Sequence, residues 1–78
     1  MVTPEQIQGY IEQGLRCLEV RVAGDGEHFE ALIVSEAFRG KSRVQRHQLV
    51  YATLGERMRG EIHALSMRTL TPEEAANG

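Results

Sequence analysis

The chain has 78 residues, a length that suits one domain but leaves little room for a deep catalytic cleft. Its formal net charge of −2 indicates no particular partner. No apolar run approaches the roughly 20 residues that a membrane-spanning helix needs. The single cysteine excludes an internal disulfide and favours a reducing compartment. We therefore expect one non-enzymatic domain, residues 1–78, in the cytoplasm and without membrane contacts.

The first expected element is a helix that begins near Thr3. Thr3 is a good N-cap, Pro4 suits the first helical position, and Gln6 can close a capping box with Thr3. Apolar side chains then recur at helical spacing; they are Ile7, Tyr10, Ile11 and Leu15.

A hairpin is expected next. Residues 18–22 alternate apolar and charged side chains, as in a strand with one buried face. Glycines at 24 and 26 can supply the positive φ of a tight turn. Residues 28–34 then form the returning, antiparallel strand.

A second helix is expected after a connector at residues 35–41. Ser42 can form a capping box with Gln45, and Gly60 supplies the C-terminal stop. The predicted apolar stripe contains one histidine; its members are Val44, His47, Tyr51, Leu54 and Met58, and the sector is widened by Leu49 and Val50.

Residues 62–69 predict a third strand, and Thr71-Pro72-Glu73-Glu74 can cap a short final helix. The third strand follows a crossing helix, so it can lie parallel to a neighbour. We expect an α+β fold of order αββαβ(α), with a mixed three-stranded sheet and helices packed on it.

Two histidines, His28 and His63, stand at strand ends where a partner can reach them. Structural zinc usually takes four protein ligands, so this pair could only contribute to a site shared with another molecule. Two ordinary histidines, one hydrogen-bonded and one solvated, are the alternative. His47 is expected at the edge of the core, and Cys17 as a buried, unreactive thiol.

The segment from residue 39 to 59 contains six basic residues and one acid, a local charge of +5. Arg39, Lys41 and Arg43 surround a glycine at the start of the second helix, a combination that can bind phosphate. The segment lacks a Walker A pattern and an aromatic ladder, and Phe38 is the one aromatic beside it. An ordinary solvated surface is the alternative.

Two long segments resemble signatures of the BolA family. Residues 38–51 are similar to its central signature and residues 62–74 to its C-terminal signature. The turn at residues 24–29 resembles the short hairpin of small bacterial members, so the resemblance covers roughly residues 3–75. It implies an αββαβ fold similar to the class II KH topology. It also implies heterodimers with a monothiol glutaredoxin, which share a bridging 2Fe–2S cluster bound by the glutaredoxin cysteine, glutathione and the BolA-type partner.

The resemblance also implies roles for individual residues. The family's C-terminal histidine ligand falls on His63, and its hairpin-loop ligand falls on His28. His47 matches the central Arg-His motif. The isolated chain is then expected to carry no tightly bound metal and to be a monomer or weak dimer.

The family is also described as transcriptional regulators, which gives the alternative function of DNA binding. The leading candidates for DNA contacts are Arg43 and Arg46, followed by Lys41 and Arg39. The chain lacks the GxxG loop of RNA-binding KH domains.

Overall fold

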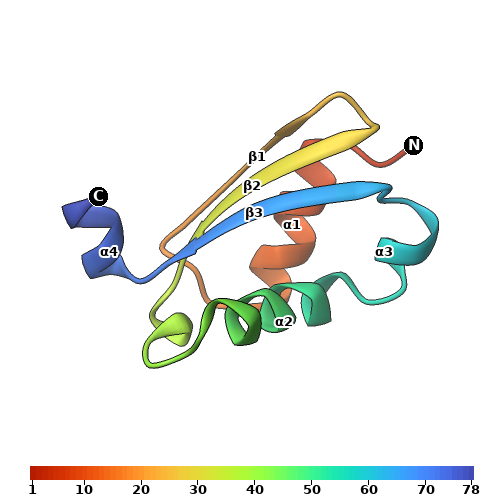
Figure 1. Ribbon diagram of the computed structural model, residues 1–78. Coiled ribbons are helices and arrows are strands. Elements are labelled where there is room, and N and C mark those ends of the chain that lie inside the picture. The colour runs from red at the N-terminus through yellow and green to blue at the C-terminus, as the bar shows by residue number, and fades with distance from the viewer.

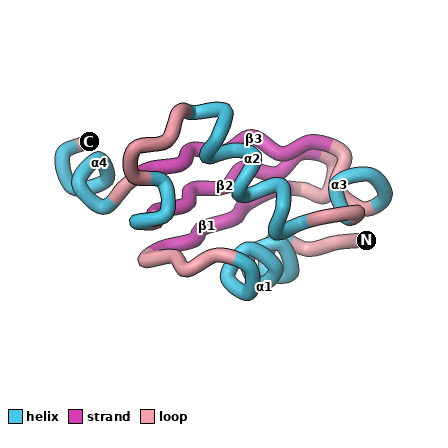
Figure 2. The backbone as a smooth tube through the Cα atoms, turned by 90° about the horizontal axis from the view of Figure 1, so that it is seen from below, coloured by secondary structure: helices cyan, strands magenta, loops and turns pink.

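The computed structural model describes all 78 residues and has its two long helices on one side of a small sheet (Figures 1 and 2). The C-terminal helix lies apart from them, beyond one end of the sheet (Figure 1). In chain order the elements are α1 (Pro4–Gly14), β1 (Glu19–Gly24), β2 (His28–Val34), the 3-10 turn η1 (Glu36–Phe38), α2 (Arg43–Leu54), α3 (Arg57–Gly60), β3 (Ala64–Leu70) and α4 (Pro72–Asn77).

The sheet is mixed, as the sequence predicts. Its strand order is β1-β2-β3, with β1 antiparallel to β2 and β2 parallel to β3. The register pairs His28 with Ala64 at one end and Val34 with Leu70 at the other. The α+β class and the αββαβ(α) order are therefore confirmed, with α3 as an additional single turn.

The core lies between the sheet and the two long helices. Phe29 and Ile33 of β2 are fully buried together with Ile7 and Ile11 of α1. Leu18 was expected in the first strand on this face, but it forms a bend before β1 and is 71% exposed. The predicted alternation is therefore wrong at its first residue.

The three helix starts were predicted correctly. Each has a threonine or serine N-cap whose side chain accepts from the N3 backbone, while the N3 side chain accepts from the cap backbone. Such caps stabilise a helix by about 1 kcal/mol each. The cap and N3 pairs are Thr3 and Gln6, Ser42 and Gln45, and Thr71 and Glu74.

Helix α2 differs from its prediction in its end and in part of its buried face. It ends at Leu54 because Gly55 has a φ of +56°, and Gly60 instead ends the separate turn α3. The buried residues are Val50 and Leu54, whereas Val44 of the predicted stripe is 65% exposed. None of the helices combines the length and hydropathy needed to cross a bilayer.

The packing of α1 against α2 helps to explain the buried face. A Cβ atom at Gly14 would lie 2.8 Å from Cγ2 of Thr53, so the helices approach closely at a point where only hydrogen fits. Val50 and Leu54, on either side of Thr53, are the buried residues of α2, as the predicted apolar sector has them. Tyr51 of the predicted stripe is instead 39% exposed.

Candidate functional sites at the two ends of the sheet

The parallel pairing of β2 and β3 brings His28 and His63 to the same end of the sheet. His28 is the first residue of β2 and pairs with Ala64, the first residue of β3, which directly follows His63. Both strands begin at the end of the sheet near α3 (Figure 1), and both histidines are exposed. We call this the histidine end of the sheet.

The hairpin turn fixes the backbone of His28. Oδ1 of Asp25 accepts from the backbone N–H groups of Glu27 and His28 at 2.9 and 3.0 Å, and these bonds hold the pKa of Asp25 below its ordinary value. Gly26, with φ of +98°, completes the turn. The imidazole Nε2 lies 3.2 Å from Oγ of Ser66, two residues along β3 from the start.

The backbone before His63 is held by α3. The carbonyl of Arg57 accepts from the N–H groups of Glu61 and Ile62 at 2.9 and 3.0 Å, and Ile62 is buried in the core. The guanidinium of Arg57 lies 3.8 Å from the ring centroid of Tyr10, which fastens α3 to α1. The imidazole of His63 therefore projects from an anchored backbone.

The chain supplies too few ligands to enclose a metal ion at the histidine end. It contains no group of three or more histidine, cysteine or acidic side chains that could hold one. Cys17 lies just before β1, which starts opposite the end of β2 and so at the other end of the sheet. It is half-buried, and burial followed by the charge of Glu12 raises the pKa of its thiol.

Arg46 is the centre of the opposite end, which we call the arginine end. Its side chain is only 13% exposed. Nε donates to the carbonyl of Lys41 and Nη1 to that of Thr69, both at 3.0 Å. Nη1 and Nη2 also donate to the two carboxylate oxygens of Glu74, at 2.7 and 3.2 Å. This candidate DNA contact is thus engaged inside the chain.

Arg39 is engaged in a similar way. Nη2 of Arg39 donates to Glu73 at 2.7 Å and to Glu36 at 2.8 Å. Glu73 and Glu74 both belong to α4, a helix without a single buried residue. Charge pairs to Arg39 and Arg46 therefore supply much of what attaches α4 to the rest of the molecule.

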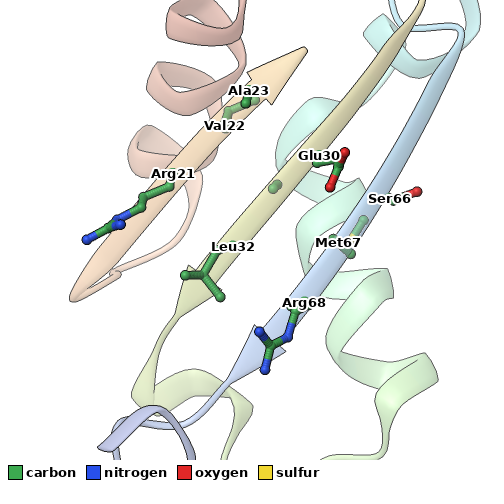
Figure 3. Close-up of a pocket in the computed structure, with 9 residues that line it drawn as sticks. Arg21, Val22, Ala23, Glu30, Leu32, Ser66, Met67 and Arg68 are labelled. Carbon is green, nitrogen blue, oxygen red and sulfur yellow. The ribbon is translucent and has the colours of Figure 1, made fainter. Parts of the chain in front are cut away.

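Three further cations at the arginine end have no ion pair. Lys41 and Arg43 are exposed. The third, Arg68, was not among the residues predicted from the sequence; it projects from β3 and can be followed in Figure 3. All three line a groove of about 470 Å³ between α2 and β3, with Arg46 and Glu74 in its wall. An arginine alternating with buried residues in an expected strand was the signal that could have identified Arg68.

Two other residues near the basic segment, Phe38 and His47, are wholly or partly withdrawn from solvent. Phe38 is fully buried, with its ring centroid 6.0 Å from the guanidinium carbon of Arg46, so it cannot stack on a base. His47 is half-buried beside the groove, away from the histidine end. Burial and the nearby charge of Arg43 lower the pKa of His47, which favours a neutral ring.

The face of the sheet that carries no long helix connects the two ends. A shallow hollow of about 310 Å³ lies on it, lined by residues of all three strands. Figure 3 shows Arg21, Leu32 and Arg68 along this face. Ser66 lies on the same face, toward the histidine end.

Comparison with known proteins gives a consistent assignment. The family model described as "BolA-like protein" matches residues 11–74. The chain is 43% identical over 72 residues to acid stress protein IbaG of Escherichia coli strain K12, covering 91% of this chain and 86% of that protein. It is 45% identical over 51 residues to the DNA-binding transcriptional regulator BolA of Haemophilus influenzae, covering 65% and 50%.

A solved structure extends the likeness to the whole fold. The structure of a BolA homologue from Coxiella burnetii superposes with a TM-score of 0.84 at 47% identity, covering 97% of this chain and 99% of that one. The family-model match at residues 11–74 also includes both signature segments, residues 38–51 and 62–74. The chain belongs to the BolA family.

Proposed function

We propose that this protein is a non-enzymatic, cytoplasmic partner of a monothiol glutaredoxin and shares a bridging 2Fe–2S cluster with it and with glutathione, in iron–sulfur trafficking or iron sensing. One observation carries the proposal. His28 and His63 are exposed at the same end of the sheet, and the chain has no third ligand to complete a site with them. An incomplete pair of ligands on an anchored surface suits a site that a second protein completes.

The donor set fits such a cluster. Imidazole is a suitable ligand for iron, and histidine in place of thiolate raises the potential of a 2Fe–2S centre. The contact between Nε2 of His28 and Ser66 resembles the outer hydrogen bonds that orient metal-binding histidines. A protonated imidazole cannot bind a metal, so cluster retention by these residues should depend on pH.

The test is co-expression with the monothiol glutaredoxin of the same organism, followed by visible circular dichroism of the purified pair at equal iron loading. We expect His63→Ala to abolish the spectrum of the mixed complex, or to convert it to that of the glutaredoxin alone. His28→Ala should have a smaller effect, because water or another group can take the place of this hairpin ligand more easily. His47→Gln is the matched control and should keep the wild-type spectrum. A wild-type spectrum with His63→Ala would refute the assignment.

We propose DNA binding as a second candidate function. A relative with 45% identity is named a DNA-binding transcriptional regulator, and Lys41, Arg43 and Arg68 line one groove without ion pairs. Phosphate contacts by such cations give an affinity that falls with salt, with a log–log slope of about −0.9 per phosphate neutralised.

The test is retardation of duplex DNA by the purified chain over a series of salt concentrations. Lys41→Glu with Arg43→Glu should abolish retardation, whereas Arg16→Glu with Arg21→Glu, the same charge change outside the groove, should weaken it less. Absence of retardation by the wild type at low salt would refute this second function.

A further inference from the structure

We propose that the Arg46 side chain forms a phosphate-binding site for duplex nucleic acid that the chain's own Glu74 occupies and thereby masks. This inference rests on the second proposed function, DNA binding, and adds a regulation of that same site. It starts from the geometry of one guanidinium group. Arginine binds carboxylate and phosphate oxygens in the same planar, two-pronged manner.

The Arg46 fork is positioned before any ligand arrives. The carbonyls of Lys41 and Thr69 accept from Nε and Nη1 at 3.0 Å each, and the side chain is 13% exposed. Of the three remaining N–H groups, one on Nη1 and one on Nη2 donate to the carboxylate of Glu74. A guanidinium that two carbonyls hold in place, and that presents a pair of donors from Nη1 and Nη2, matches what an oxyanion requires.

The surroundings of the fork are cationic. Lys41, Arg43 and Arg68 line the same groove as Arg46, and Glu74 is the one acidic residue in its lining. Three cations without ion pairs therefore line the groove in which this single carboxylate lies. A phosphate of a nucleic-acid backbone in the place of the carboxylate would meet the Arg46 fork in a cationic groove.

The carboxylate that occupies the site belongs to an element that can give way. Helix α4 buries none of its residues, and its acidic contacts are Glu74 to Arg46 and Glu73 to Arg39. The carboxylates of both pairs are themselves solvent-exposed, at 45% for Glu74 and 58% for Glu73, so salt and a competing polyanion can reach them. Glu73 pairs with Arg39, which also donates to Glu36, so removing both carboxylates should free Arg46 and leave Arg39 with one of its two acidic partners.

The experiment compares the wild type with Glu73→Gln plus Glu74→Gln. Glutamine removes the charge but keeps a side-chain oxygen at residue 74 that can preserve the capping box with Thr71. The matched control is Glu5→Gln plus Glu12→Gln, which makes the same change in net charge on α1, where neither residue pairs with an arginine. Binding of a 20–30 base-pair duplex is measured against salt for all three proteins.

We expect the α4 variant to bind with a log–log salt slope steeper than that of the wild type by about 0.9 to 1.8, for one or two added phosphate contacts. The α1 control should show the wild-type slope. Adding Arg46→Lys to the α4 variant should remove part of the gain, because lysine lacks the fork. A slope for the α4 variant equal to that of the control, or no binding by either, would overturn the inference. If only the α4 variant binds, masking is supported while DNA binding by the wild type fails.

Discussion

The two ends of the sheet use their polar residues in opposite ways. At the histidine end, His28 and His63 are exposed on a fixed backbone, and the chain offers no further ligand for what they could bind. At the arginine end, Arg39 and Arg46 have all their obvious partners within the chain. Side chains left free at one end suit an external partner, whereas those engaged at the other hold the fold together.

This comparison predicts that the largest loss of stability will come from Arg46. Arg46→Met removes the donors to the carbonyls of Lys41 and Thr69 and leaves Glu74 without its partner. Hydrogen bonds to charged groups contribute about 1.5–3 kcal/mol each, and partial solvent exposure reduces this contribution. We therefore expect a loss of about 2 kcal/mol in the free energy of unfolding. Urea denaturation measures it.

The matched control for this prediction is Arg43→Met, an exposed arginine of the same helix without an ion pair. Its unfolding free energy should change by less than about 0.5 kcal/mol, as at most surface positions. Equal losses in the two variants would show that the internal contacts of Arg46 do not stabilise the fold.

Acid should weaken the arginine end specifically. The hydrogen bonds from Arg46 lower the pKa of Glu74 from 4.5 to about 2, and Arg39 lowers that of Glu73 in the same sense. A carboxyl group with a depressed folded-state pKa stabilises the fold above its unfolded pKa, and this contribution is lost as pH falls from about 4.5 towards about 2.

The measurement is the midpoint of urea unfolding between pH 7 and pH 2. We expect the wild type to lose stability more steeply below pH 4.5 than Glu74→Gln, whose residue 74 has no proton to gain. Glu5→Gln is the control and should follow the wild-type curve. Parallel curves for wild type and Glu74→Gln would show that the ion pair with Arg46 does not form in solution.

Local signals in the sequence explain which parts of the fold were predicted. Capping residues and the hairpin glycines act on their immediate neighbours, so the helix starts and the limits of β2 were correct. The end of α2 was missed because Gly55 interrupts a pattern that Met58 continues. Its buried face was predicted only in part, since Val50 and Leu54 are buried but Val44 and Tyr51 are exposed; the contact of Gly14 with Thr53, which lies on this face, joins residues far apart in the chain.

The same distinction applies to the candidate sites. His28 and His63 could be placed at one end of the sheet once the parallel pairing was expected, because both precede or start a strand. Arg46 and Glu74 are separated by 28 residues, and only the tertiary structure shows that they meet. The contrast between a basic segment and an acidic C-terminus was the available signal, but it does not identify pairs.

A smaller effect is expected at the histidine end from Arg57, which lies over the ring of Tyr10. Arg57→Ala removes this cation–π contact and should cost about 0.5–1 kcal/mol of unfolding free energy. Arg59→Ala, on the exposed side of the same turn, is the control and should cost less. If the contact positions the backbone before His63, the amide resonances of Glu61, Ile62 and His63 should shift in the first variant and stay in place in the second.

A similarly small effect on stability is expected from Cys17, whose variant also tests at which end of the sheet a cluster binds. Its half-buried thiol has a raised pKa and donates to the carbonyl of Leu15 at 3.4 Å, so it behaves as a packing group. Cys17→Ala should cost about 1 kcal/mol or less in unfolding free energy and leave the circular dichroism of a glutaredoxin complex unchanged. The complex with His63→Ala, measured in parallel, gives the spectrum expected when a proposed ligand is lost. Cys17 lies at the end of the sheet opposite His28. If Cys17→Ala abolishes the spectrum while the protein stays folded, the cluster does not bind at the histidine end.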